Sequence, residues 1–484
     1  MKFATFCTVL FWLWLISTNA AMGQKVIVSE PEDINMRVDD FAVIGPINEY
    51  LAVYRKYNGK AEVILYSPFM RKFKTISLTS ISANFSRIYF ASNGESIAIF
   101  YQQREQKNEQ LYALTIGKDY IINPPVLLTS IPTQSSVDNI YFERESSADH
   151  SIHFLYTSYM QGGARVVKSI TLTQQLQILS TTEQAFADKD NYIAETAAIG
   201  NSGNAYLLMS DKPSSKGLSE QLKLLQCSPG SNVWIPLKIE LGKHAVGELK
   251  LAMNNPSHTL YVAGYYGESR YTNATGVFHL TYSEENNIMV STIFSPLTLT
   301  MNSGTGKNDL RDIKLRHVSL RKDGGIEFVG ERFTHQMRTI SSMAPVMMMN
   351  NGFMPVQDNV RSVHEYVYDE ILIISLKEDG LPDWQQRVLK EQISNDDGGI
   401  YASFGVLEHS LGKAYFFNDN SNRRTRLKVA YINGDSEMSI KEIQLGEDIS
   451  RWNLMPRSAK QVSSTEIIVP CVSKNYLCFL KISY

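Results

Sequence analysis

Residues 51–66 read Leu-Ala-Val-Tyr-Arg-Lys-Tyr-Asn-Gly-Lys-Ala-Glu-Val-Ile-Leu-Tyr. Two runs with alternating apolar and polar side chains flank the pair Asn58-Gly59. Asn-Gly is the strongest short signal for a two-residue β-hairpin turn, because both residues tolerate a positive φ. Such a turn places Arg55 opposite Glu62, a favourable cross-strand pair. The stretch therefore predicts two antiparallel strands, in the middle of a unit that runs from about Val38 to Leu78.

The same rhythm of three or four short strands recurs every 40–50 residues or so, which is typical of the blades of a β-propeller. Its clearest later strands are 96–101, 152–156, 205–209, 259–263, 326–330, 413–417 and 466–469. The first strand of the third unit is expected at 139–142, and 383–392 fits a turn or two of helix as well as a strand. We predict an all-β, eight-bladed β-propeller, with seven blades as the alternative.

The two ends of the chain share the last predicted blade. Residues 466–469 and 476–480, with one weak strand before them, leave that blade without its outermost strand. The run Lys25-Val-Ile-Val28 precedes the first blade and supplies a spare strand. We expect it to complete the C-terminal blade, because a ring closed in this way leaves no open sheet edge.

Residues 1–23 have the pattern of a secretory signal peptide. Lys2 precedes an apolar run, 3–16, that is too short to span a membrane as a helix. Ala21-Met-Gly23 predicts cleavage after Gly23, with Ala20 as the alternative site, and an uncleaved anchor is a further alternative. We expect a secreted or periplasmic protein without a membrane span, in which residues 24–484 form a single propeller domain.

Composition narrows the classes of partner. The 484 residues carry a net charge of −2, and 43% of them are hydrophobic, as in a globular protein. Lys and Arg form no long basic stripe, which argues against binding to nucleic acid. We expect an envelope protein or a glycan as the partner.

Two cysteines flank a predicted turn at Lys474-Asn475. A two-residue turn there places Cys471 directly opposite Cys478, close enough for a cross-strand disulfide. Secretion favours the bond, and two buried free thiols are the alternative.

The chain lacks the usual catalytic and metal-binding motifs. It has no Gly-x-Ser-x-Gly, and His364-Glu365 lacks the second histidine of a zinc-binding His-Glu-x-x-His. We therefore assign no catalytic residue, no cofactor and no metal ligand. A pair of carboxylates for glycoside hydrolysis stays open, because any two acidic residues can meet in space.

Residues 334–363 interrupt the rhythm between the second and third strands of the sixth unit. Long loops in compact domains are often functional, and methionine suits adaptable binding surfaces. The candidate binding residues are His335, Met343, Met347, Met348, Met349, Phe353 and Met354. We interpret the insertion as a flap that binds a partner or ligand. A plug over the channel or a neighbouring blade is the first alternative, and Cu(I) capture by the thioethers is the second.

The sixth unit also carries a resemblance. Residues 322–331 begin Lys-Asp-Gly-Gly, and the strand 369–376 leads through Asp379-Gly380 to Trp384. With Asp-Asp-Gly-Gly at 396–399, this region, about 313–420, resembles a repeat of secreted bacterial β-propellers, in particular uncharacterised envelope propellers of the Bacteroidota. The resemblance implies fold and compartment and no catalytic residues; Asp-Gly would form a turn and Trp384 would pack between blades.

These observations predict a non-enzymatic propeller that acts as a protein-interaction or ligand-binding platform. The alternative is a carbohydrate-binding or carbohydrate-active propeller, a hydrolase or lyase, with its site at the mouth of the channel. Carboxylates, arginines or histidines facing the channel would favour the alternative, and an apolar channel would favour the platform.

Overall fold

A computed structural model describes residues 24–82, 84–133, 140–187, 192–211, 217–297, 310–342, 359–419, 426–446, 449 and 451–484. The predicted signal peptide, residues 1–23, lies outside the described residues. Within the described part of the chain, no helix has the length and hydropathy needed to cross a membrane.

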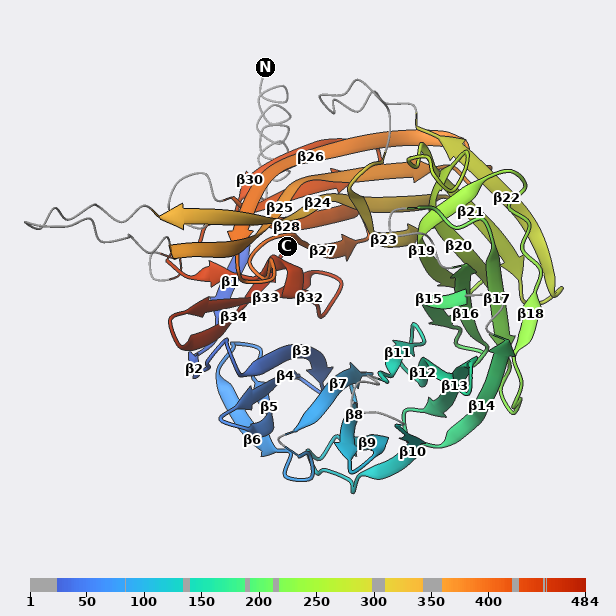
Figure 1. Cartoon of the computed structure of the whole chain (residues 1–484). Helices are drawn as coiled ribbons and strands as arrows, with labels where there is room; N and C mark the ends of the chain where they lie inside the picture. Colours follow the sequence, from blue (N-terminus) through green and yellow to red (C-terminus); the bar gives the residue numbers. More distant parts are fainter. Residues whose placement is uncertain are drawn as a thin grey trace, which may run out of the picture.

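The described residues form eight antiparallel sheets arranged around a ring, and in the seven blades that a single run of chain forms, the first strand lies nearest the centre (Figure 1). The first four blades contain β3 Asp40–Ile47, β4 Tyr50–Tyr57, β5 Lys60–Tyr66 and β6 Lys72–Ser77; β7 Phe85–Ser92, β8 Ile97–Glu105, β9 Asn108–Ile116 and β10 Val126–Pro132; β11 Glu143–Ser146, β12 Ile152–Gln161, β13 Ala164–Thr173 and β14 Ile178–Ala187; and β15 Tyr192–Ile199, β16 Ala205–Asp211, β17 Leu222–Cys227 and β18 Ile235–Leu237.

The next three blades follow the same order. They contain β19 Ala245–Asn254, β20 Thr259–Gly267, β21 Gly276–Ser283 and β22 Ile288–Pro296; β23 Ile313–Leu320, β24 Ile326–Ser342, β25 Asn359–Leu376 and β26 Pro382–Asn395; and β27 Phe404–His409, β28 Gly412–Asp419, β29 Arg426–Asn433 and β30 Met438–Glu442.

Strands from both ends of the chain form the eighth blade. Its main path is β1 Lys25–Val28, β34 Tyr476–Ser483, β33 Glu466–Ser473 and β31 Asn453–Leu454, and the short strands β2 Glu32–Asp33 and β32 Lys460–Gln461 pair with β34 and β33. β1 pairs antiparallel with β34, from Lys25 opposite Ser483 to Val28 opposite Leu480. The N-terminal strand thus completes the C-terminal blade, as the sequence predicted.

The sequence predictions hold for the number of blades and need one correction in detail. The first strand of blade three is β11, Glu143–Ser146, and not 139–142; Phe142 is instead fully buried in the core. Of the two alternatives for residues 383–392, the strand is confirmed, since they lie in β26 and pair with β25. In blade one, Arg55 pairs with Glu62 as predicted, and Asn58 and Gly59 take φ of 50° and 75°.

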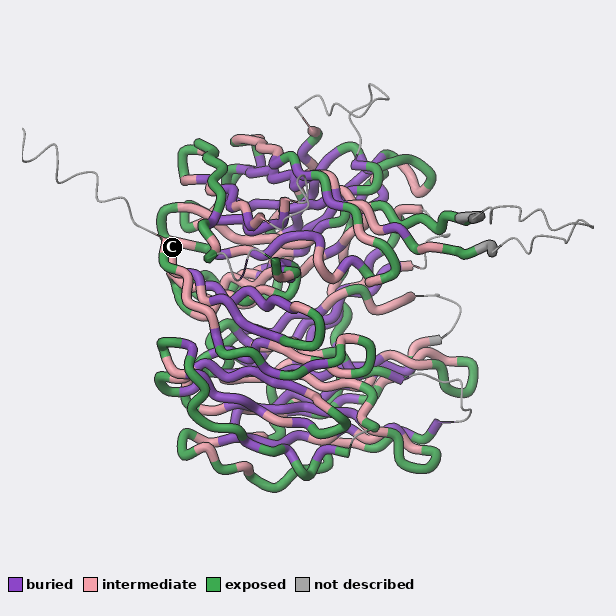
Figure 2. Tube along the Cα trace, turned by 90° about the vertical axis from the view of Figure 1, so that its left-hand side faces the viewer, coloured by how far each residue is buried: buried purple, intermediate pink, exposed green. Residues whose placement is uncertain are grey.

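Buried apolar side chains pack between neighbouring blades. In Figure 2 the buried residues lie mainly along the strands and the exposed ones mainly in the turns. One cluster joins Val53 and Ile64 of blade one to Ile468 and Phe479 of the last blade. Another joins blades six and seven and includes Trp384, in agreement with the packing that the resemblance implied. Because each blade is covered on both faces, its middle strands are continuously apolar and need not alternate.

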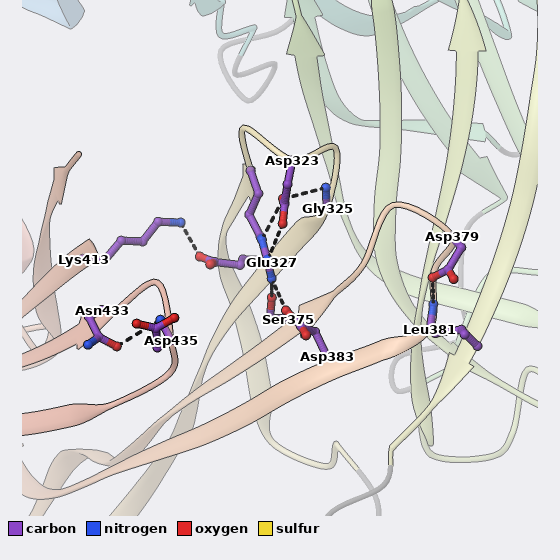
Figure 3. Close-up of polar contacts among 11 residues, drawn as sticks. Asp323, Gly325, Glu327, Ser375, Asp379, Leu381, Asp383, Lys413, Asn433 and Asp435 are labelled. Atoms are coloured by element: carbon purple, nitrogen blue, oxygen red, sulfur yellow. Dashed lines mark hydrogen bonds and ion pairs between the residues drawn. The ribbon is translucent and has the colours of Figure 1, made fainter. Parts of the chain in front are cut away.

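One face of the ring carries a repeated five-residue turn. In the turns at Asp323 and Asp379, the carboxylate accepts the backbone N–H two residues on, over 3.2 Å from Gly325 and 3.0 Å from Leu381 (Figure 3). The glycine after each aspartate has a φ near 80°, which explains the Asp-Gly pairs in the sequence. The opposite face holds the connections between second and third strands, including that of blade six.

Candidate functional site

The connection between β24 and β25 differs from its counterparts in the other blades. These strands have 17 and 18 residues, whereas no described strand of the other seven sheets exceeds ten. Residues 334–342 pair with residues 359–367 beyond the packed blade; we call this paired segment the arm. In Figure 1 it extends past the neighbouring strands, and Figure 2 shows it as an exposed pair of strands.

The arm changes the interpretation of the insertion. It does join the second and third strands of the sixth blade, but it is not an irregular loop from Thr334 onward. The pairing of β24 with β25 continues through Ser342 opposite Asn359, because the residues alternate between two faces without a turn signal. Of the predicted binding residues only His335 lies in the arm; Met343, Met347, Met348, Met349, Phe353 and Met354 lie outside the described residues.

One face of the arm carries a row of stacked rings. His335 pairs with Tyr366 across the strands, and their rings stack with centroids 4.6 Å apart and an interplanar angle of 6°. His364 lies diagonally beside His335, with 3.1 Å between His335 Nε2 and His364 Nδ1. Met337 is the cross-strand partner of His364 and is 65% exposed. The row therefore ends at two imidazoles and a thioether in solvent.

The opposite face of the arm is polar. Glu365 accepts a hydrogen bond from Gln336 Nε2 over 2.5 Å and forms an ion pair of 2.8 Å with Arg338. Arg361 pairs with Asp396 over 2.9 Å, which connects the arm to the end of β26. These contacts satisfy the polar groups of this face locally and leave the ring-bearing face uncovered.

Below the arm, blade six contains a buried carboxylate. The Glu331 side chain has no exposed surface and pairs with Lys390 Nζ and Arg316 Nε, each over 2.9 Å. Ser403 of the following loop donates a third bond, over 2.7 Å. Burial lowers the pKa of Lys390, and the adjacent Glu331 counteracts that shift. A buried charge of this kind is tolerable only when it is paired and hydrogen-bonded.

A β-bulge lies at the same level. The register of β24 against β25 shifts between Glu331 and Phe333, next to Glu370. Glu370 pairs with Arg332 over 2.9 Å and also with Arg387, which fixes the bulged strands. Bulges increase twist and redirect a strand. The bulge and its ion pairs form the base from which the arm leaves the blade.

A hollow of about 870 Å³ lies beside this base, between β26 and strands β28 and β29. Lys390, Asn418 and Lys428 are among its lining residues. Lys390 is already paired with Glu331, and Lys428 with Asp419 over 2.7 Å. Both lysines of the hollow thus already have a carboxylate partner.

The innermost strands bear charged residues. In β11, Arg144 donates to the carbonyl of Phe90 over 2.8 Å, and burial raises the pKa of Glu145 to about 7. Burial and the nearby Arg144 lower the pKa of Lys460 in β32 to about 8. Lys460 Nζ donates to the carbonyl of Ile44 over 2.7 Å. The wall around the ring's centre is therefore not purely apolar.

The cysteine pair has the predicted register. Cys471 lies directly opposite Cys478 across the hairpin of β33 and β34. Both are buried and carry free thiols, and Cys471 Sγ lies 3.5 Å from the carbonyl oxygen of Cys478. The disulfide itself stays a prediction.

Sequence reasoning missed Met337, His364 and Tyr366 as neighbours of His335. His364 stands 29 positions away, and the only signal was the alternation of residues on both sides of the insertion. That pattern fits two paired strands, but the register that brings the two histidines together is not visible in it.

No protein-family model and no curated protein matches the chain. Among solved structures, it is similar to prolyl oligopeptidase B from Galerina marginata, with 9% identity and a TM-score of 0.42 over 92% of this chain and 55% of that one. It is also similar to the dihydro-heme d1 dehydrogenase NirN, with 10% identity and a TM-score of 0.42 over 92% and 71%. The β-propeller domain of the Trilobed protease from Pyrococcus furiosus has 9% identity and a TM-score of 0.38, over 87% and 99%.

The chain spans about half the length of the prolyl peptidase structures that it matches. None of these likenesses carries an argument about what the chain does.

Proposed function

We propose that this protein is a secreted or periplasmic propeller that binds a protein partner of the cell envelope through the arm of blade six. The observation that carries the proposal is the ring-bearing face of the arm. Phe333, His335, Met337, His364 and Tyr366 follow one another along it, and the last four lie beyond the packed blade. Aromatic and methionine side chains are enriched where proteins bind one another.

The free-energy cost of ordering the arm supports a functional role for it. Ordering each residue costs about 1–2 kcal/mol of backbone entropy, which burial in a core normally offsets. Thr334 to Thr339 are all exposed, so the arm recovers little of this cost from the blade. A two-residue turn connects the equivalent strands of blade one. The additional length is thus unnecessary for closing a blade.

The compartment is part of the proposal and rests on sequence alone. The apolar run 3–16 and the resemblance of residues 313–420 to Bacteroidota envelope propellers both support export. N-terminal sequencing of the protein from its native envelope tests it. A chain that begins at Gln24 or Ala21 supports export with cleavage, and one that retains Met1 contradicts cleavage and leaves the uncleaved anchor.

The experiment on function uses a graft that keeps the blade intact. Because His335 pairs with Tyr366, replacing residues 336–365 by Asn-Gly closes the hairpin with a two-residue turn. Residues 24–484 with and without the graft are used to capture cross-linked partners from the native envelope. A stoichiometric protein partner lost with the graft supports the proposal.

Two results would contradict it. A partner captured equally by the grafted chain places the binding surface elsewhere on the ring. Absence of any protein partner points instead to a glycan or another small ligand. Arg361→Ala, on the polar face of the arm, is the matched control and should retain the partner.

A second candidate function rests on Glu145. Its raised pKa of about 7, close to Arg144 on an innermost strand, suits a carboxylate that exchanges protons with a substrate in the channel. This supports the carbohydrate-active alternative. Turnover of any polysaccharide by the wild type, abolished in Glu145→Gln at unchanged stability, would replace the platform proposal. Equal turnover in the variant would exclude Glu145 as its catalytic group.

A further inference from the structure

The two histidines of the arm bring one nitrogen of each ring within hydrogen-bonding distance of the other. His335 Nε2 and His364 Nδ1 face each other over 3.1 Å, and both side chains are exposed. Imidazole nitrogens bind transition metals at about 2.0–2.1 Å. Two nitrogens 3.1 Å apart then subtend roughly 100° at a shared metal ion, an angle compatible with ordinary coordination. If both rings turn so that these nitrogens point at one ion, the pair supplies two ligands to it.

The thioether of Met337, as a third ligand beside the two imidazoles, determines which class of metal ion the site would prefer. Met337 lies opposite His364 in the register and on the same face of the arm as both histidines. Among the described residues, no group of three or more His, Cys, Asp and Glu is placed to hold a metal ion. A site of hard ligands is therefore not formed here. A thioether beside two imidazoles favours soft Cu(I) over Zn²⁺ or Mg²⁺.

The backbone of the three residues and the ring of His335 are held in place before any metal binds. The His335 ring stacks on Tyr366, and farther down the row Phe333 packs on Tyr368 with centroids 4.8 Å apart. The hydrogen-bonded ladder of β24 and β25 continues through all of these residues. Fixed ligands lose less entropy on binding, and an exposed face gives the ion a path of entry.

We infer that His335, His364 and Met337 form a Cu(I)-binding site on the arm. The inference does not rest on the proposed protein partner. Binding uses the lone pairs of His335 Nε2 and His364 Nδ1, so the proton that lies between them moves to the outer nitrogen of its own ring. No electron transfer is needed when copper arrives as Cu(I).

The test is a titration of residues 24–484 with Cu(I) under anaerobic conditions, against a chromogenic Cu(I) chelator. We expect one ion per chain to resist the chelator. His335→Gln and His364→Gln should each weaken binding about tenfold or more. The methionines of residues 343–354 are unchanged in both variants, so they cannot account for such a loss. His258→Gln, an exposed histidine of another blade, is the matched control and should bind as the wild type does.

X-ray absorption identifies the ligands independently of affinity. The wild type should show two nitrogen ligands and one sulfur, and Met337→Leu should lose the sulfur. The inference is overturned if the chelator removes all copper from the wild type, if both histidine variants bind as tightly as the wild type, or if Zn²⁺ displaces Cu(I). An unchanged sulfur signal in Met337→Leu would equally exclude that thioether.

The site and the partner can be separated experimentally. If the protein binds copper but captures no protein partner, the metal site is supported and the partner proposal fails. If it captures a partner but binds no copper, the partner proposal is supported and the metal site fails. Circular dichroism of each variant checks folding, which should be unaffected because these side chains lie outside the core.

Discussion

Two hairpins occupy the same position in two blades and end differently. β4 and β5 of blade one meet in a two-residue turn, whereas β24 and β25 of blade six continue into the arm. Arg55 is the sixth residue of β4, and Glu331 is the sixth residue of β24. Arg55 pairs with Glu62 and, over 3.0 Å, with Glu32, while Glu331 pairs with Lys390 and Arg316. Both blades thus have a layer of buried ion pairs at the same level.

The comparison of the two hairpins shows the level at which a blade ceases to pack against its neighbouring sheets. Below the ionic layer, both hairpins bury apolar residues against neighbouring sheets. Above it, blade one closes within a few residues. Blade six instead extends two strands into solvent, where they satisfy their polar groups on one face and display rings on the other. The layer separates the part of the hairpin that stabilises the fold from the part available for binding.

The largest expected effect comes from breaking the ionic layer of blade six. Glu331→Ala leaves the buried Lys390 without its carboxylate partner and removes that of the half-buried Arg316, so the free energy of unfolding should fall by about 3–5 kcal/mol. Urea denaturation at pH 7 measures the change. Arg361→Ala in the arm, whose side chain is 76% exposed, should change stability by less than about 0.5 kcal/mol. Equal losses of stability in the two variants would mean that the ionic layer and the arm contribute equally to the stability of the fold.

Buried histidines provide a test by pH, in contrast to the exposed histidines of the arm. Burial lowers the pKa of His153 and of His279 to about 4, below the value of about 6.5 in an unfolded chain. Their stabilising contribution is therefore complete above pH 6.5 and is lost as the pH falls toward 4. The loss should reach about 3 kcal/mol for each histidine.

His279→Phe should remove part of this dependence, because the ring stays buried but no longer titrates. Stability curves measured by urea denaturation from pH 4 to 8 show the effect. Parallel curves for the variant and the wild type would mean that His279 is protonated to the same extent in both states.

The turn of blade one has a smaller expected effect. Gly59 has a φ of 75°, a conformation that costs other residues about 1–2 kcal/mol. Gly59→Ala should lower stability by about 1 kcal/mol, visible as a lower midpoint in urea. Gly434→Ala is the matched control, since a methyl group there meets nothing within 4 Å and Gly434 has no positive φ. A larger effect at Gly434 would contradict the assignment of strain to the turn.

The smallest effect is expected from removing the arm. Replacing residues 336–365 by Asn-Gly makes the hairpin of blade six resemble that of blade one and should change stability by less than about 1 kcal/mol. Thermal and urea unfolding of the grafted chain measure it. A loss of several kcal/mol would show that the arm is part of the packed blade.

The repeat itself was sufficient to predict the architecture. Asn58-Gly59 fixes a turn and its register locally, and the same alternation recurs often enough to indicate eight blades. The unfilled outer position in the last blade predicted the pairing of β1 with β34. The turn depends on residues that are neighbours in the sequence, and the number of blades follows from the number of strands. Backbone geometry determines both.

The candidate site depended on tertiary structure. Residues 334–363 read as an interruption because they depart from the strand rhythm of the other blades. Only the pairing of β24 with β25 brings His335 to within 3.1 Å of His364, and only packing of blade six on blade seven buries Glu331. The sequence by itself determined the strands and their number. The register of the long hairpin depends on contacts between residues far apart in the chain, and so does the pairing of buried charges. A local sequence pattern does not specify such contacts.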